Sequence, residues 1–236
     1  MEREAGVLSS QTTVVALVNG MIGGIILVMP ILALKSGFLM IAPVVMVCGF
    51  FSYYSCLLCI RHLRNYKDLD EAVLKHFDNK RSYKIFYDVC IALSLVILLI
   101  LYFDLICKQW EGITARSRLI PVLNAIVLFP AVYVMKKYNF GASLLAYGII
   151  STIGYCFFIL YMWINAPSGT KHFASFDSHF PQLAAALGQG FSIQAFFVPI
   201  LKKNENKNNY KQLVKYAYLI GAIVYAFIGY GGSLST

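Results

Sequence analysis

Two segments of the chain place glycine, proline and amide side chains inside otherwise apolar runs. The first extends from Asn19 to Pro30 and contains Gly20, Gly23 and Gly24. Each glycine lowers helix propensity by roughly 1 kcal/mol relative to alanine, and Pro30 removes a backbone hydrogen bond. In transporters, such an interruption exposes amide groups that bind a substrate carboxylate and carbonyl groups that bind a cation. The alternative is that the glycines only let another helix approach closely.

The second segment extends from Leu187 to Pro199 and has the same kind of composition. Its glycines and polar residues are Gly188, Gln189, Gly190, Ser192 and Gln194. Interrupted helices at corresponding positions in two halves of a chain are the best sequence indicator of a transport site. The two segments fall in the first and sixth apolar runs, where two halves of five helices each would begin. We therefore expect both helices to break, with Pro30, Gly190 and Pro199 contributing to the breaks.

The third apolar run carries two carboxylates, Asp88 and Asp104, one near each end. An ionisable residue inside a membrane span is by default a functional candidate. Both residues lie within about two turns of an expected membrane interface, where they reach water or pair with Lys84 or Lys108. We therefore expect these carboxylates to contact water or a lysine rather than to act in a binding site.

The sequence contains no pattern typical of an enzyme or a metal site. Cys56 and Cys59 form a C-x-x-C motif, but it lies in an apolar run without a second pair. The four histidines lie in loops and form no ligand cluster. No nucleophile elbow, zinc-protease motif or phosphate-binding loop is present. We expect no catalytic residues, no metal and no cofactor, apart from Na⁺ or H⁺ coupling if the chain is a transporter.

The composition assigns the chain to the membrane proteins. Of its 236 residues, 59% are hydrophobic and 13% are charged, and the mean hydropathy is +0.67. A soluble domain has about 25% charged residues, so the charged residues here are too few to cover a water-facing surface. The 17 Phe and 16 Tyr residues exclude a disordered chain. We predict an all-α, multi-pass integral membrane protein that is surrounded by the lipid bilayer.

Seven apolar runs are candidates for transmembrane helices. They are residues 11–34, 39–60, 84–107, 119–135, 140–164, 182–201 and 213–234. A spanning helix needs about 20 mostly apolar residues. The runs are continuous rather than alternating, which favours helices over barrel strands. The first run ends at Lys35 without a small-residue cleavage site, so we do not interpret it as a cleaved signal peptide.

The basic residues predict the orientation of these helices. With the N-terminus inside, 15 of the 20 Lys and Arg residues lie in the inner segments and five in the outer loops. Because Lys and Arg are enriched in cytoplasmic loops, we expect the N-terminus inside. The net charge of +9 then reflects topology rather than nucleic-acid binding. Residues 66–77 place apolar and charged side chains at helical spacing, which predicts an amphipathic helix at the inner membrane surface.

Several motifs resemble those of the amino acid/auxin permease family, which includes vesicular, lysosomal and plasma-membrane amino acid transporters. Residues 19–30, followed by Ala-x-x-Ser-Gly-Phe at 33–38, are similar to the first helix of that family. Residues 66–69 resemble its Tyr-x-Asp-Leu segment, residues 136–139 its junction between helices 4 and 5, and residues 188–200 its sixth helix. The likeness extends in order over the whole chain.

The resemblance implies a fold of about eleven helices in a five-plus-five inverted repeat. Residues 1–165 would then form the first repeat and residues 166–236 would contain helices 6 and 7 of a truncated second repeat. The chain departs from the family at Ile25 and Val28, where small residues are usual, and at the bulky pair 196–197. These side chains would crowd the backbone that a substrate carboxylate approaches.

Two functions are compatible with these features. The first, which the resemblance implies, is secondary active transport of amino acids by alternating access, in a plasma membrane or endomembrane. Its substrate-binding residues would be Asn19, Gly20, Gly23, Gly24, Ser192 and Gln194.

The second function is that of a shortened relative that transports nothing and acts as a structural subunit of a larger membrane complex. A respiratory-chain assembly in the mitochondrial inner membrane is one example of such a host. This function is favoured by the departures at Ile25 and Val28 and by a length that covers only seven helices. A chain that continued beyond Thr236 for four further helices would favour transport instead. The sequence leaves the substrate, the coupling ion, the organelle and the oligomeric state open.

Overall fold

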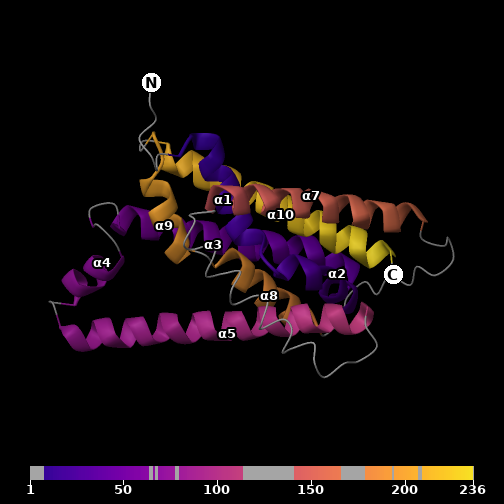
Figure 1. The fold of residues 1–236 in the computed structure, drawn as a ribbon, viewed down its shortest axis with the longest axis horizontal. Coiled ribbons are helices and arrows are strands. Elements are labelled where there is room, and N and C mark those ends of the chain that lie inside the picture. Colours follow the sequence, from indigo (N-terminus) through magenta and orange to yellow (C-terminus); the bar gives the residue numbers. More distant parts are fainter. Residues whose placement is uncertain are drawn as a thin grey trace. The chain divides into compact units, whose positions relative to one another are not determined.

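The protein is helical throughout the residues that its computed structural model describes. These are residues 8–63, 66, 69–77, 80–113, 141–165, 179–192, 194–206 and 209–235. Within them, the β-type pairing is a single isolated bridge between Leu8 and Asn204, and no strand is formed. The prediction of an all-α protein is thus confirmed for the described residues (Figure 1).

The helices follow the predicted apolar runs closely. They are α1 (Ser10–Ile22), α2 (Ile25–Ser36), the 3₁₀ turn η1 (Phe38–Met40), α3 (Ile41–Leu63), α4 (Leu69–His76), α5 (Arg81–Ile113), α7 (Gly141–Asn165), α8 (Phe180–Phe191), α9 (Gln194–Lys202) and α10 (Tyr210–Ser235). The predicted run 119–135 lies outside the described residues. The predicted amphipathic segment 66–77 contains α4.

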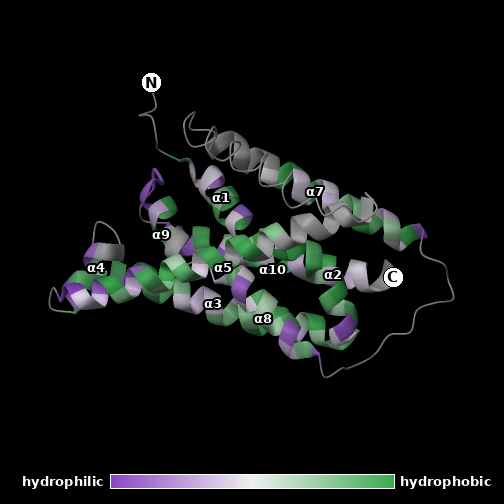
Figure 2. Cartoon of the chain, turned by 60° about the horizontal axis from the view of Figure 1, so that its bottom comes forward, coloured by the Kyte–Doolittle hydropathy of each residue, from purple (hydrophilic) through white to green (hydrophobic). Residues whose placement is uncertain are grey.

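Three of the described helices are long and apolar enough to cross a membrane. They are Phe38–Leu63, Gly148–Asn165 and Tyr210–Ser233. Helices α1 and α2 would make a fourth span if they are taken together, because they pass the same test as a pair that is bent by 53°. Figure 2 shows hydrophobic residues along most of these helices and hydrophilic residues mainly at helix ends. By length and composition, the described residues therefore contain three or four candidate spans, which fits a membrane protein.

The chain divides into two compact units, which we describe separately. The first comprises residues 1–68 and 145–236, and the second comprises residues 69–144. Helices from both sides of residue 165, the predicted boundary between the two repeats, belong to the first unit. The predicted division into repeats concerns internal symmetry, so it stays a prediction.

Helix α10 is central to the first unit, where it contacts α1, α2 and α3. Glycines on α10 allow these close approaches. A Cβ atom built on Gly232 would lie 2.3 Å from Cβ of Pro30 in α2, and one built on Gly229 would lie 3.0 Å from Cγ2 of Ile41 in α3. Close packing through small residues is a common way for membrane helices to associate. Part of the glycine content therefore serves helix packing.

The two ends of the first unit contain different loops. At one end, the Leu8 amide donates to the Lys203 carbonyl over 2.7 Å, and the Lys202 ammonium donates to the Tyr66 carbonyl. At the other end, the Ala42 amide of α3 donates to the hydroxyl of Tyr230 in α10 over 3.2 Å. The N-terminal segment, the segment after α3 and the α9–α10 loop therefore lie at the same end of this unit.

In the second unit, α4 packs against the N-terminal part of α5. Ala72 of α4 is buried, and the ring of Phe77 stacks on the ring of Tyr83 with centroids 4.7 Å apart. The apolar side of α4 thus faces another helix of its own unit. A helix of this kind is amphipathic because one face packs while the other remains polar.

Candidate functional site

The first helix is interrupted at Gly23 and Gly24. Gly23 follows α1 with φ 41° and ψ −155°, and Gly24 precedes the first residue of α2, Ile25. Positive φ is accessible to glycine without the steric cost that a Cβ atom brings. The chain therefore turns here between two half-helices that are bent by 53°.

The carbonyl groups at the end of α1 are satisfied by a tyrosine of α10. The last carbonyls of a helix lack partners within the helix. The hydroxyl of Tyr225 donates to the Met21 carbonyl over 2.6 Å and lies 3.2 Å from the Ile22 carbonyl. Tyr225 is fully buried. Backbone groups that could bind a cation are thus held by a side chain of the protein itself.

The second interruption lies between Phe191, the last residue of α8, and Gln194, the first residue of α9. Here too, a tyrosine of α10 donates a hydrogen bond to a carbonyl group at the end of the preceding helix. The hydroxyl of Tyr218 donates to the Phe191 carbonyl over 3.0 Å. Tyr218 and Tyr225 are seven residues apart in α10, which is close to two helical turns. One face of α10 therefore supplies a hydroxyl group to each break.

Aromatic rings fill the space between the two breaks. The ring of Phe191 lies 5.2 Å from that of Tyr225, edge to face, and 5.9 Å from that of Tyr218, nearly parallel. The ring of Phe197 in α9 lies 5.6 Å from that of Tyr218. All four side chains are buried. The two breaks therefore lie side by side around a packed aromatic cluster, which we define as Phe191, Phe197, Tyr218 and Tyr225.

A pocket of about 380 Å³ lies on another side of the first break, between it and α7. It is lined by Asn19, Ile22, Gly23, Ile26, Leu27, Gly148, Ser151, Thr152 and Tyr155. Its polar side chains are one amide and three hydroxyl groups, and none of the lining residues is charged. This volume lies in the range of small-molecule sites, which is about 300–1,000 Å³.

Asn19 points its side chain toward α7. A Cβ atom built on Gly148 would lie 2.1 Å from Oδ1 of Asn19, so only glycine leaves room for the amide at this position. One turn further along α7, the Thr152 hydroxyl donates to the Gly148 carbonyl over 2.9 Å. The amide of Asn19 and the hydroxyl of Thr152 therefore lie on facing walls of the pocket.

The predicted binding residues are placed unequally around this site. Asn19 and Gly23 line the pocket. Gly20 is exposed in α1, and Gly24 is partly buried at the start of α2. Ser192 is exposed after α8. Gln194 begins α9, and its side chain lies outside the described residues.

The predicted helix breakers lie inside helices. Pro30 is the sixth residue of α2 and Pro199 the sixth of α9, and Gly190 precedes the last residue of α8. A proline deprives a helix of one hydrogen bond, and both half-helices continue past it. The turns themselves occur at Gly23–Gly24, which precede Pro30, and after Phe191, between Gly190 and Pro199.

The residues that complete the site were not predicted from the sequence. Tyr218 and Tyr225 were not singled out, nor were Gly148, Thr152 and Tyr155 of α7. A usable signal was present, because a buried tyrosine in an apolar helix needs a partner for its hydroxyl group. Two tyrosines at a spacing of seven place that requirement on one helix face.

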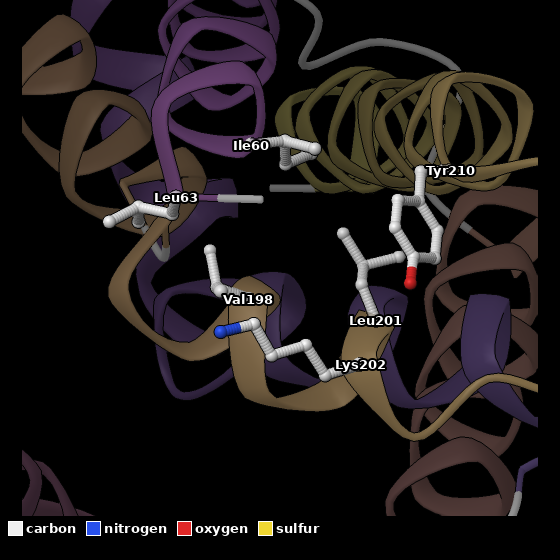
Figure 3. Close-up of a pocket in the computed structure, with 6 residues that line it drawn as sticks. All are labelled: Ile60, Leu63, Val198, Leu201, Lys202 and Tyr210. Carbon is white, nitrogen blue, oxygen red and sulfur yellow. The ribbon is translucent and has the colours of Figure 1, made fainter. Parts of the chain in front are cut away.

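A second, smaller cavity lies at the C-terminal end of α9, next to the α9–α10 loop. Figure 3 shows Val198 and Lys202 of α9 with Ile60 and Leu63 of α3 and Tyr210 of α10 around it. Its volume is about 20 Å³, which is enough for about one water molecule. It is therefore too small to be a substrate site.

The remaining sequence candidates show no site geometry among the described residues. Groups of three or more His, Cys, Asp or Glu side chains that could hold a metal are absent there. Cys56 is buried and Cys59 partly buried, and both are free thiols. Asp88 is exposed on α5, whereas the side chain of Asp104 lies outside the described residues.

The chain matches no protein-family model, no curated protein and no solved structure. The likeness to amino acid/auxin permeases therefore rests on the sequence motifs alone.

Proposed function

We propose that this chain forms the broken-helix core of a secondary transporter of amino acids. The observation that carries the proposal is the pocket of about 380 Å³ at the first break, with Asn19 and Gly23 in its wall. Unwound backbone inside a membrane protein is tolerated where it is packed or lines a cavity. The first break has both surroundings, with Tyr225 on its packed side and the pocket on its open side.

The chemistry of the pocket suits an amino acid. Helix α2 begins at Ile25 beside it, and a helix N-terminus attracts a carboxylate through its backbone N–H groups and its dipole. The amide of Asn19 can donate to a carboxylate and accept from an ammonium group. The Thr152 hydroxyl, which donates its proton to the Gly148 carbonyl, can accept from the ammonium group. The absence of charged residues among the lining residues favours a substrate without net charge, such as a neutral zwitterion.

In this proposal the chain follows the seven-helix, N-terminus-inside topology. Residues 1–165 form the first five-helix repeat, and residues 166–236 begin the second, with broken helices 1 and 6 at equivalent positions. Movement of one helix bundle against the other exposes the pocket alternately to each side of the membrane. A gradient of Na⁺ or H⁺ drives the cycle.

Uptake into proteoliposomes tests the proposal. The purified chain is reconstituted, and uptake of a mixture of labelled amino acids is measured with and without a Na⁺ or pH gradient. Asn19→Ala should lower gradient-dependent uptake by about tenfold or more, because hydrogen bonds to a charged substrate are worth about 1.5–3 kcal/mol. Asn165→Ala is the matched control, since Asn165 is exposed at the end of α7 and donates to the Tyr161 carbonyl. Absence of gradient-dependent uptake for every amino acid in the unmodified chain would rule the transporter out.

A structural subunit of a larger membrane complex is the second candidate. It is favoured by the aromatic cluster, because Tyr218 and Tyr225 occupy carbonyl groups that a transporter would offer to ligands. Purification from native membranes in mild detergent tests it. Recovery in fixed stoichiometry with other membrane subunits supports this candidate, and recovery of a free monomer contradicts it.

A further inference from the structure

The hydroxyl group of Tyr225 touches three helices at once. It belongs to α10, it donates to the Met21 carbonyl at the end of α1, and it lies directly on the backbone of α8. The last contact follows from Gly190, because a Cβ atom built there would lie 2.5 Å from Oη of Tyr225 and 3.1 Å from Cδ1 of Ile25. The end of α1 and the end of α8 therefore meet at one buried oxygen, and the start of α2 lies next to Gly190.

Phe191 connects this point to the second break. Its carbonyl accepts from the Tyr218 hydroxyl, while its ring contacts both Tyr218 and Tyr225. Gly221 of α10 lies under the same ring, since a Cβ atom there would be 3.6 Å from Cε1 of Phe191 and 3.4 Å from Cε of Met21. Moving α1 away from α10 would thus break the hydrogen bond between the Tyr225 hydroxyl and the Met21 carbonyl and loosen the packing around Phe191.

We propose that Tyr218 and Tyr225 form a latch that holds both helix breaks closed, so that the two breaks open as a single step. A buried carbonyl that loses its hydrogen-bond partner is costly, so each break opens only when its carbonyls gain a new donor, from water or from a ligand. Because Phe191 lies between the two tyrosines, opening one break removes packing from the other. The inference rests on the proposed function, in which this opening admits the substrate.

Hydrogen–deuterium exchange in lipid nanodiscs tests the latch without measuring transport. Tyr225→Phe removes the hydroxyl and keeps the buried ring. We expect exchange to rise about tenfold or more, as loss of a hydrogen bond to buried carbonyls would produce, in peptides around residues 17–30 and also around residues 186–197. Tyr216→Phe is the matched control, since Tyr216 is exposed on the same helix, and it should change neither peptide. A rise confined to residues 17–30, or no rise, would overturn the proposal.

Two glycine substitutions in α8 provide the same test, because they change the helix that the Tyr225 hydroxyl contacts. Gly190→Ala introduces a Cβ atom that meets the Tyr225 hydroxyl, whereas Gly188→Ala adds one with no heavy atom within 4 Å. Gly190→Ala should reproduce the rise in both peptides, and Gly188→Ala should leave both at the unmodified rate. If Gly190→Ala raised exchange only around residues 186–197, the breaks would be independent and the latch wrong.

The two proposals can fail separately. Coupled exchange in a chain that takes up no amino acid would retain the latch and reject transport. Uptake that depends on Asn19, combined with unchanged exchange in Tyr225→Phe, would retain transport and reject the latch.

Discussion

The two helix breaks have the same kind of hydrogen-bond donor for their carbonyl groups but different backbone conformations at the turn. At the first break the chain turns through Gly23, whose φ of 41° suits glycine. At the second, Ser192 follows α8 with φ −86° and ψ 60°, which needs no glycine. In both cases the last carbonyl groups of the preceding half-helix accept a hydrogen bond from a tyrosine of α10. The comparison teaches that local sequence sets how each turn is made, whereas one distant helix satisfies both.

The two sides of the first break have different surroundings. Its inner side is buried under Tyr225, Phe191 and Met21. Its other side, at Asn19 and Gly23, borders the pocket against α7. A break that is satisfied on one side keeps its conformation while the other side remains available to a ligand. This division makes the first break the better candidate for binding.

The largest expected effect comes from removing the side chain that closes the first break. Tyr225→Ala should lower the free energy of unfolding by about 3–5 kcal/mol, because it leaves a cavity and removes the donor to the Met21 carbonyl. Thermal and denaturant unfolding in detergent micelles measures the change. Tyr216→Ala, which truncates a tyrosine that is 53% exposed, should stay within about 0.5 kcal/mol. Equal losses in the two variants would show that the aromatic cluster does not hold the break.

The next effect concerns how α10 holds the second half of the broken first helix. Gly232→Ala places a Cβ atom 2.3 Å from Cβ and 2.9 Å from Cα of Pro30, so α2 or α10 has to shift. Overpacking of this kind costs about 1–3 kcal/mol. The same unfolding experiment should show no loss for Gly154→Ala in α7, where no heavy atom lies within 4 Å. A stable Gly232→Ala would mean that α2 is held by other contacts.

The smallest effect distinguishes the two turns themselves. Gly23→Ala should destabilise the chain by about 1–2 kcal/mol, because a Cβ atom is disfavoured at positive φ. Ser192→Ala should change stability by less than about 0.5 kcal/mol, since Ser192 is exposed and has negative φ. Unfolding midpoints of the two variants, measured side by side, give the comparison. If Ser192→Ala were the more destabilising, the proposed difference between the turns would be reversed.

Hydrophobic runs predicted the positions of the helices well. The run 11–34 covers most of α1 and α2, and the run 213–234 falls within α10. The weak helix propensity of residues 19–30 indicated an interruption, which occurs at Gly23–Gly24. The packing role of Pro30 could not be predicted from local helix propensity. Its ring packs against Gly232, and a contact over two hundred residues of chain has no local sequence signal.

Two of the residues predicted for substrate binding line the pocket, and their role stays a prediction. Asn19 and Gly23 line the pocket, but the residues opposite them belong to α7 and not to the second broken helix. Composition indicates that an amide in an apolar helix requires a polar or close-packed neighbour. It does not identify which helix supplies that neighbour, because Gly148 becomes the partner of Asn19 only when α1 and α7 pack together.

The sequence by itself determined that this chain forms long apolar helices, which fit a membrane protein, and that its first and sixth apolar runs are weak helices. These properties follow from local composition, since apolar length sets the span and glycine and proline lower helix propensity. Only the tertiary structure decided what happens at the breaks. It placed the hydroxyl groups of Tyr218 and Tyr225 on their carbonyls and left the pocket open beside Asn19. Hydrogen bonds and packing between distant segments depend on how helices meet, which no local pattern in the sequence encodes.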